Sequence, residues 1–88
     1  MRNKKIIISE PFENAFAKLP KEIRDLVYQK IQLFQISPFH PSLRVKKMKG
    51  TQAIWEMSIS MNYRLTFENR ETGILLRKIG THDILRSP

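Results

Sequence analysis

The sequence predicts an α+β fold, in which an N-terminal strand and a two-helix hairpin come before a four-stranded antiparallel sheet. Two observations predict it: apolar residues recur at helical spacing before residue 37, and they alternate with polar residues after residue 53. Between these regions lie Pro38 and Pro41, which disfavour helix at their own positions and at the residue before each. A chain of 88 residues is expected to form a single domain, residues 1–88, with a small core.

The first half of the chain has the signals of one strand and two helices. Lys4 to Ile8 is a short run rich in β-branched residues, which favours a strand. Ser9 is a suitable N-cap for a first helix, whose apolar residues extend to Leu19. Pro20 interrupts that helix and suits the first turn of a second one. The second helix has an apolar stripe at helical spacing, formed by Ile23, Leu26, Val27, Ile31 and Phe34.

The second half of the chain predicts four strands joined by short turns. The strands are expected at Leu43 to Met48, Ala53 to Ile59, Tyr63 to Glu68 and Gly73 to Ile79. The turns at residues 50–52, 60–62 and 69–72 are too short for the crossover that parallel strands need, so the strands should pair antiparallel. The helix hairpin should cover one apolar face of this sheet, formed by Trp55, Met57, Ile59, Tyr63, Leu65 and Phe67.

The chain is strongly basic. Sixteen Lys and Arg residues against eight Asp and Glu give a net charge of +8 with neutral histidines. Residues 1–44 and 45–88 each contain eight basic and four acidic residues, so the excess belongs to the folded body and not to a tail. The densest group of cations is Arg44, Lys46, Lys47 and Lys49. Such a surface attracts polyanions, of which nucleic acid and an acidic protein segment are the obvious candidates.

Several functional classes are disfavoured by what the sequence lacks. Cysteine is absent, so disulfides and thiolate metal sites are excluded, and the chain suits a reducing compartment. The apolar run Ile6 to Ile8 is too short for a signal sequence or a membrane span, which favours a cytoplasmic location without a membrane partner. With two histidines and no paired carboxylate motif, neither a metal nor another cofactor is expected.

The order of elements, together with three short segments, resembles the RelE/ParE superfamily of bacterial toxins from type II toxin–antitoxin pairs. The segments are the basic strand that ends in Lys49-Gly50, the strand Tyr63-Arg64-Leu65-Thr66-Phe67, and the terminal element Gly80-Thr81-His82. The arginine strand is similar to that of RelE, and the terminal element is similar to the end of YafQ-type toxins. The resemblance covers nearly the whole chain. It implies a ribosome-dependent endoribonuclease that cuts mRNA and is held inactive by an antitoxin.

The chemistry of metal-free RNA cleavage suggests which residues would act. A base must take the proton of the 2′-hydroxyl, a cation must stabilise the phosphorane, and an acid must protonate the leaving 5′-oxygen. His82 has the side chain type that titrates near neutral pH and can serve as acid or base. Arg64 can clamp two phosphate oxygens with its planar fork, and Glu56 is the carboxylate suited to a general base. We expect these three side chains to converge on the polar face of the sheet.

The remaining cations are expected to bind the RNA backbone and the antitoxin. Phosphate contacts are assigned to Arg44, Lys46, Lys47, Lys49 and Arg77. An antitoxin with an acidic helical segment would cover the stretch from Arg44 to Lys49. The other partners implied are mRNA, the ribosome, and operator DNA bound through the antitoxin complex.

Each candidate residue also has a purely structural explanation. Arg64 could form an ion pair with Glu56 across neighbouring strands. His82 could be a surface turn residue held by Asp83, and His40 is expected to be part of a loop and not a ligand. The lysine cluster could be a solvated strand edge that resists aggregation.

Two other functions stay open beside the ribonuclease. One is a ParE-like toxin that inhibits DNA gyrase, and the other is a catalytically degenerate member that only binds its antitoxin. RelE carries lysines where this chain has Glu56 and Ser58, and YafQ-type enzymes use several histidines where this chain has one. The predicted site is therefore a hybrid of the two types.

Overall fold

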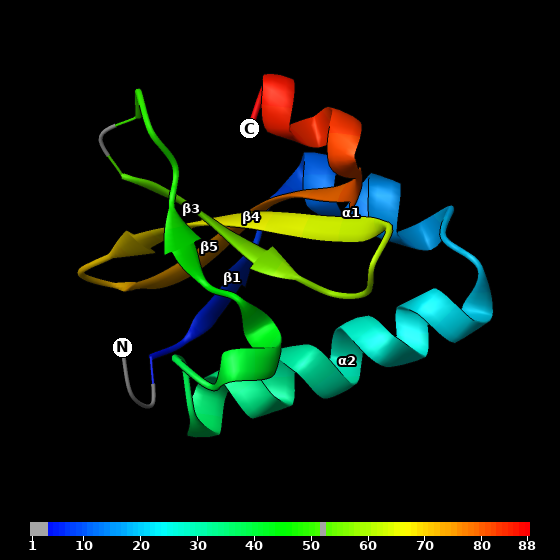
Figure 1. The fold of residues 1–88 in the computed structure, drawn as a ribbon, viewed down its shortest axis with the longest axis horizontal. Helices are drawn as coiled ribbons and strands as arrows, with labels where there is room; N and C mark the ends of the chain where they lie inside the picture. Colours follow the sequence, from blue (N-terminus) through cyan, green and yellow to red (C-terminus); the bar gives the residue numbers. More distant parts are fainter. Residues whose placement is uncertain (1–3, 52) are drawn as a thin grey trace.

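The structure is a computed structural model, and it describes residues 4–51 and 53–88. Residues 1–3, and Gln52 of the predicted turn 50–52, lie outside the described residues. In chain order the elements are β1 (Ile6–Ile8), α1 (Glu10–Ala17), α2 (Lys21–Ile36), the 3-10 helix η1 (Pro41–Leu43), β2 (Lys46–Lys47), β3 (Ile54–Ser58), β4 (Tyr63–Arg70), β5 (Gly73–Thr81) and the 3-10 helix η2 (His82–Arg86). Figure 1 shows the sheet between α2 on one side and the C-terminal η2 on the other.

The strands form one five-stranded sheet in the order β1-β5-β4-β3-β2. Strands β2 to β5 pair antiparallel with one another, which confirms the predicted four-stranded meander and the α+β class. The N-terminal strand joins as a fifth strand, and it pairs in parallel with β5, with Ile6 opposite Ile74. The long connection from β1 through both helices and three strands satisfies the crossover that a parallel pair needs.

A glycine permits the parallel pairing of β1. The amide of Ile74 donates a 2.8 Å hydrogen bond to the carbonyl oxygen of Lys5. A Cβ on Gly73 would overlap that same carbonyl oxygen, so any other residue at this position would push β1 away from β5.

The two helices begin where their capping residues predict. Ser9 is the N-cap of α1, since its Oγ accepts a 3.2 Å hydrogen bond from the amide of Phe12. The same hydroxyl donates to the carbonyl oxygen of Arg77 at 3.1 Å and so ties the start of α1 to β5. Pro20 lies at the N-cap position of α2 and separates the two helices, as its missing amide hydrogen leads us to expect.

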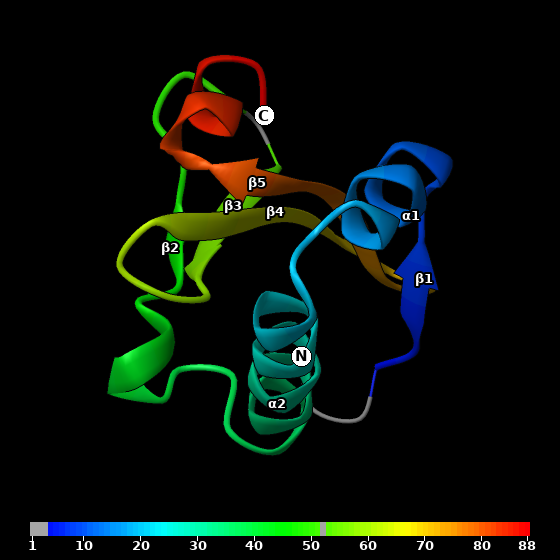
Figure 2. The same ribbon diagram turned by 90° about the vertical axis from the view of Figure 1, so that its right-hand side faces the viewer.

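The core lies between α2, α1 and one face of the sheet (Figure 2). Phe67 is at its centre, with its ring 5.0 Å from that of Phe34 on α2 and 6.3 Å from that of Trp55 on β3. Four of the six side chains predicted for the apolar face are fully buried, while Trp55 and Tyr63 are half-buried. Each fully buried large apolar side chain contributes about 1.5–3 kcal/mol to stability. The buried apolar residues are Phe12, Val27, Phe34, Leu43, Met57, Ile59, Leu65, Phe67, Ile74, Leu76 and Ile79.

The predicted strand from Leu43 to Met48 is wrong over its first residues. Leu43 ends η1, and Arg44 follows it with a φ of 48°, in the left-handed region that no strand residue adopts. Lys46 and Lys47 pair with Glu56 and Trp55 of β3, and the amide of Met48 still donates to the carbonyl oxygen of Ile54 at 2.9 Å. The prolines before this segment start a 3-10 turn, and the buried side chain of Leu43 anchors that turn in the core.

The last two strands are longer than predicted. β4 continues from Glu68 to Arg70, and β5 continues from Ile79 to Thr81. A bulge at Arg77 accompanies the extra length, because Thr66 faces Lys78 while the next residue, Phe67, faces Leu76. The bulge keeps the core side chains on one face despite the extra residue.

Candidate functional site

A row of polar residues crosses the sheet on the face opposite the core, which we call the polar face. Residues paired across strands share a face, so the ladder defines the row directly. From β2 to β5 it consists of Lys46, Glu56, Thr66 and Lys78. Glu56 is therefore on the polar face, as predicted, but its side chain is only 12 % exposed, and the Nζ of Lys46 lies 4.0 Å from its Oε1.

Arg64 lies in the next row, opposite Ser58 on β3 and Gly80 on β5. Its Nη1 donates to three carbonyl oxygens of the β3–β4 turn, those of Ser60, Met61 (3.2 Å) and Tyr63 (3.0 Å). Those bonds turn the guanidinium along the end of the sheet. Within the described residues it forms no ion pair with Glu56, whose cross-strand partner is Thr66, so the alternative role for Arg64 as a partner of Glu56 is not observed.

His82 begins η2, directly after β5. The element Gly80-Thr81 was expected past the strand end, but both residues belong to β5, with Thr81 opposite Tyr63. His82 and Arg64 thus come from neighbouring strands at the same end of the sheet. The side chain of His82 is exposed, and no hydrogen bond or ion pair joins it to Asp83 in the part of the chain that the structure describes.

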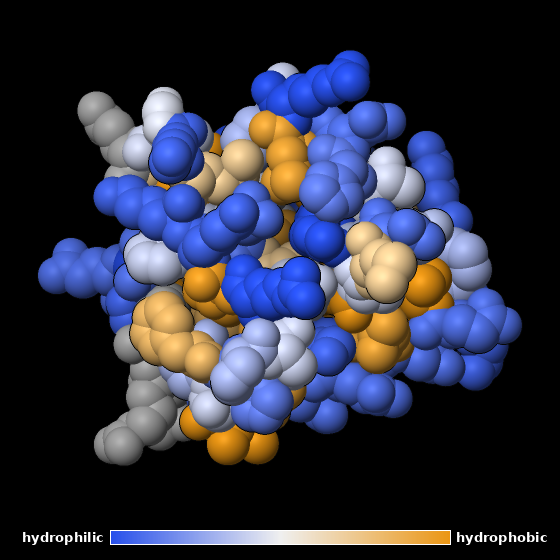
Figure 3. Space-filling model, in the orientation of Figure 1, coloured by the Kyte–Doolittle hydropathy of each residue, from blue (hydrophilic) through white to orange (hydrophobic). Residues whose placement is uncertain are grey.

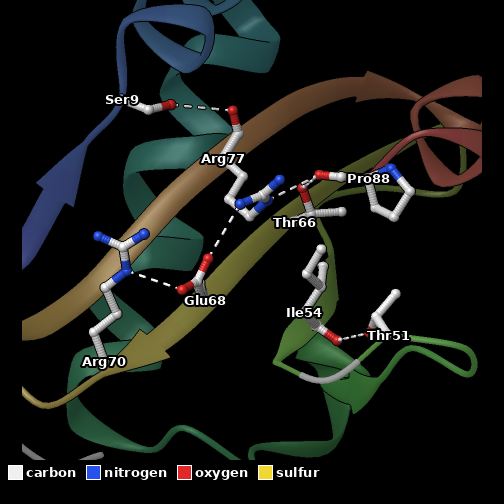
Figure 4. A network of polar contacts seen from close by, with 8 residues as sticks. All are labelled: Ser9, Thr51, Ile54, Thr66, Glu68, Arg70, Arg77 and Pro88. Atoms are coloured by element: carbon white, nitrogen blue, oxygen red, sulfur yellow. Dashed lines mark hydrogen bonds and ion pairs between the residues drawn. The ribbon is translucent and has the colours of Figure 1, made fainter.

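The C-terminal segment folds back over the middle of the polar face. Thr66 is 0 % exposed beneath it, and its Oγ1 donates to the carbonyl oxygen of Pro88 at 3.2 Å. The Nε of Arg77 donates to the same oxygen at 3.1 Å, as Figure 4 shows, and Lys78 donates to the carbonyl oxygen of Ser87. The middle of the polar face is therefore filled, which the alternating pattern of the strands did not predict.

Arg77, a predicted phosphate contact, is instead part of an ion-pair network. Its Nη1 lies 3.1 Å from Glu68 Oε2, and Arg70 Nε lies 2.9 Å from Glu68 Oε1 (Figure 4). The hydrogen bond from Arg70, and the charges of Arg70 and Arg77, hold the pKa of the Glu68 carboxyl below its usual range despite its partial burial. A guanidinium held this way is poorly placed to bind RNA.

The cations of the segment from Arg44 to Lys49 do not share one surface. Lys46 and Lys47 are consecutive strand residues, so their side chains point to opposite faces of the sheet. Lys46 lies on the polar face beside Glu56, Lys47 points the other way, and Lys49 is exposed in the turn that follows. Hydrophilic side chains spread over much of the molecular surface in Figure 3, with apolar patches between them.

A hollow at the end of the sheet brings three cations together. It has a volume of about 490 Å³, lies between α2, η1 and the β3–β4 turn, and we call it the cationic hollow. Its lining residues are Lys30, Pro41, Ser42, Arg44, Ser58, Ile59, Ser60, Met61 and Arg64. Among the described residues, no acidic side chain lines it. Two predicted site residues, Arg44 and Arg64, therefore meet here, while His82 and Glu56 are not among the lining residues.

Lys30 is the residue that sequence reasoning missed. It lies on α2, three residues after buried Val27 and four before buried Phe34, so it borders the helix face that packs on the sheet. A lysine at the edge of an apolar helix stripe is the sequence signal from which Lys30 could have been predicted.

A second hollow, of about 450 Å³, lies between β1, α1 and α2. Its walls include Ile6, Ile8, Phe12, Phe16 and Ile31, and among the described residues that line it Glu13 is the one charged side chain. The groove is therefore mainly apolar, unlike the cationic hollow.

Within residues 4–51 and 53–88, no three His, Asp or Glu side chains gather as a possible metal site. The same part of the chain contains no helix that is both long and apolar enough to cross a membrane.

The comparisons with known proteins identify the fold. No protein-family model matches the chain, and no curated protein sequence matches it either. Among solved structures, a chain of the RelB–RelE antitoxin–toxin complex from Methanococcus jannaschii is similar over 91 % of this chain and 94 % of that one, at 21 % identity and a TM-score of 0.74.

Two further structures agree. A chain of the E. coli DinJ–YafQ toxin–antitoxin complex covers 93 % of this chain and 96 % of its own, at 13 % identity and a TM-score of 0.78. The YoeB dimer from Staphylococcus aureus covers 90 % and 97 %, at 12 % identity and a TM-score of 0.75. The chain therefore has the RelE/ParE-like toxin fold, as its segments led us to expect.

Proposed function

We propose that the protein is the toxin of a type II toxin–antitoxin pair and that it cuts mRNA on the ribosome by metal-independent attack of a 2′-hydroxyl. The observation that carries the proposal is the register in which Arg64 faces Gly80, two residues before His82. A guanidinium and an imidazole from neighbouring strands then border the same end of the sheet. The fold shared with RelE and YafQ structures and the net charge of +8 support the proposal.

Each proposed role follows from side-chain chemistry and position. Arg64 stabilises the charge that develops on the phosphate, since its Nη1 holds the turn while its Nε and Nη2 edge matches two phosphate oxygens. Exposed His82 is accessible to an RNA ligand and acts as the acid that protonates the leaving 5′-oxygen. Glu56 takes the 2′-hydroxyl proton as general base, in a site where Lys46 lies beside its carboxylate.

The test is to induce the protein in bacterial cells and to map new 5′ ends on transcripts, with and without ongoing translation. The expected result is growth arrest with new ends that appear only on translated mRNA. His82→Ala and Arg64→Ala should each abolish both effects, because general acid–base catalysis and phosphate stabilisation each contribute about 10²-fold or more in rate.

The chain offers a matched control at its other histidine. His40 caps η1, where its Nδ1 accepts from the amide of Ser42 at 3.2 Å, and His40→Asn preserves a side chain suited to that cap. This variant should still arrest growth and cut mRNA. If growth arrest persists in both His82→Ala and Arg64→Ala without RNA cleavage, the ribonuclease proposal fails. That result would support the alternative of a gyrase inhibitor.

We also propose that an antitoxin with an acidic helical segment neutralises the protein by wrapping around the edge strand β2, where it covers the exposed cations from Arg44 to Lys49 on both faces of the sheet. Because these charges are exposed, binding should weaken as salt is raised from 0.05 to about 0.5 M. A Lys47→Gln/Lys49→Gln variant should weaken the complex and flatten its salt dependence. An affinity that does not respond to salt would contradict this mode of binding.

A further inference from the structure

We infer that the cationic hollow is a phosphate subsite for RNA, in which Lys30 and Arg44 join Arg64 in binding the backbone phosphate whose charge Arg64 is proposed to stabilise. This inference rests on the proposed function for the choice of RNA as the ligand. Lys30 on α2, Arg44 after η1 and Arg64 on β4 all line the same hollow. We therefore treat the three cations as one binding site.

The charge of the hollow favours an anion. Its three cationic side chains come from three different elements, and none of them forms an ion pair within the described residues. Like charges held around one concave surface repel each other, and an anion between them relieves that repulsion. The turn carbonyls account for the place of Arg64, but no side-chain hydrogen bond or ion pair within the described residues accounts for Lys30 or Arg44 beside it.

The geometry of Arg64 suits an oxyanion that accepts two hydrogen bonds at once, as a phosphate does. Its Nη1 is used by the turn carbonyls, which orient the guanidinium before any ligand arrives. The opposite edge, Nε and Nη2, has no hydrogen-bond partner in the described part of the chain and offers two parallel donors. A pre-oriented fork loses less entropy on binding, and paired N–H donors match two phosphate oxygens.

The rest of the wall suits a nucleotide. Ser42 and Ser60 add hydroxyl groups near the cations, while Met61 and Pro41 provide apolar surface at the rim. Met61 is 87 % exposed, although it is a large apolar side chain. A volume of about 490 Å³ accommodates a phosphate with its attached sugar. The hollow thus combines charge for the backbone with an apolar rim for a sugar or base.

The left-handed backbone at Arg44 gives an informative variant. Its φ of 48° is unfavourable for a residue with a side chain, and glycine adopts it readily. Arg44→Gly should therefore keep the fold stable while it removes the cation. An arginine in this conformation is explained more easily by binding than by folding.

The test measures binding and does not need cleavage. A fluorescent 2′-O-methyl RNA hexanucleotide, which lacks the attacking hydroxyl, is titrated into the full chain and its variants by anisotropy across a salt series. Lys30→Gln and Arg44→Gly should each reduce the slope of log affinity against log salt by about 0.7, and should each weaken binding roughly fivefold at 0.1 M salt, because one single-strand phosphate contact is lost.

A control on the same helix distinguishes the effect of a local phosphate contact on RNA affinity from the effect of the protein's net charge. Lys21 is 77 % exposed and lies about 14 Å from Lys30 along the axis of α2, beyond the screening length at 0.1 M salt. Lys21→Gln removes the same charge outside the hollow and should leave both affinity and slope unchanged. Equal losses in Lys21→Gln and Lys30→Gln would overturn the subsite.

The failure of the subsite and the failure of the proposed function give different results. If wild type cleaves RNA in a His82-dependent manner but Lys30→Gln and Arg44→Gly bind the hexanucleotide normally, the ribonuclease stands and the subsite is wrong. If binding depends on Lys30 and Arg44 while no cleavage occurs, the subsite stands without the enzyme. A hexaglutamate peptide provides a further comparison in NMR spectra. If this peptide shifts the Ser42 and Ser60 amide resonances and the hexanucleotide does not, the RNA subsite is wrong and the hollow binds a protein ligand.

Discussion

Gly80 and Ile84 lie so close together that a Cβ on residue 80 would be 2.8 Å from the Cγ2 of Ile84. Gly80 faces Arg64 across the sheet, and Ile84 belongs to η2, which packs against β4 and β5. The missing side chain at residue 80 therefore allows η2 to approach the polar face. It also fixes the direction in which His82 leaves β5.

Gly80→Ala should displace η2. The added methyl group meets a β-branched side chain whose χ1 rotation is restricted, and overpacking of this kind costs about 1–3 kcal/mol. We expect a lower urea midpoint and a changed His82 ring resonance in NMR spectra, since His82 is the first residue of η2.

A second substitution should reverse much of this effect. In Gly80→Ala/Ile84→Ala the offending Cγ2 is gone, so the double variant should lose less stability than the two single variants together. A double-mutant cycle measures the difference as a coupling energy. Additive losses would show that Gly80 is needed for a reason other than the approach of Ile84.

Glu68→Gln should lower stability near neutral pH and lose its effect in acid. The carboxylate of Glu68 accepts from Arg70 and Arg77, which lower its pKa from the ordinary value of 4.5. A carboxyl whose folded pKa is lowered stabilises the fold above its unfolded pKa, and that contribution disappears as pH falls through the folded value. With the side chain 21 % exposed, we expect a loss of about 0.5–1 kcal/mol at pH 7.

Urea unfolding at pH 7 and at pH 3 checks this expectation. The wild type and Glu68→Gln should converge in stability as the solution becomes acidic. Glu71→Gln is a matched control in the neighbouring turn, where the side chain is exposed and forms no ion pair within the described residues, and it should change stability by less than about 0.5 kcal/mol at either pH. A constant difference between wild type and Glu68→Gln would mean that the ion pairs contribute nothing.

Ser9→Ala should destabilise the protein by about 1–2 kcal/mol, because one hydroxyl both caps α1 and bonds to β5. Ser9→Thr keeps the hydroxyl and should recover most of that loss. Ser37 is a useful comparison, since it ends α2 through its backbone amide, and no side-chain bond is observed for it in the described chain. Equal effects of Ser9→Ala and Ser37→Ala on the melting temperature would refute the double role of Ser9.

Periodicity predicted the elements that one buried face defines. The stripe from Ile23 to Phe34 and the alternation around Leu65 each indicate which side of the element is apolar. The helix, the strand and their buried faces could therefore be predicted without knowledge of the tertiary structure. The parallel neighbour of β1 could not be predicted this way. The run Ile6 to Ile8 is apolar throughout, and three such residues do not specify which edge of the sheet they join.

The candidate site was harder to predict, because it depends on contacts between distant residues. The alternation of β4 put Arg64 and Thr66 on the same face, but Thr66 is buried by Pro88, which is 22 residues away in sequence. Arg44 turns into the left-handed region, where no periodic pattern exists to reveal it. Lys30 joins these cations only because α2 passes beneath the β3–β4 turn.

Arg64→Lys should separate the structural use of Arg64 from its proposed use in binding. A lysine ammonium has three donors and can still reach the turn carbonyls of Ser60 and Tyr63, but it has no second edge for a phosphate. We therefore expect the slow hydrogen exchange of the Ile59 amide, which donates to Tyr63 O at 3.0 Å, to survive in Arg64→Lys.

Binding of the 2′-O-methyl hexanucleotide should nevertheless weaken about tenfold in Arg64→Lys, since the lysine loses at least one charge-assisted hydrogen bond to the phosphate, worth about 1.5–3 kcal/mol. Arg70→Lys, the same substitution at an arginine that pairs with Glu68, should leave RNA affinity unchanged. If Arg64→Lys binds the oligonucleotide as tightly as wild type, the guanidinium serves the turn alone. The phosphate would then have to be held by Lys30 and Arg44 without it, because these are the remaining cations that line the hollow.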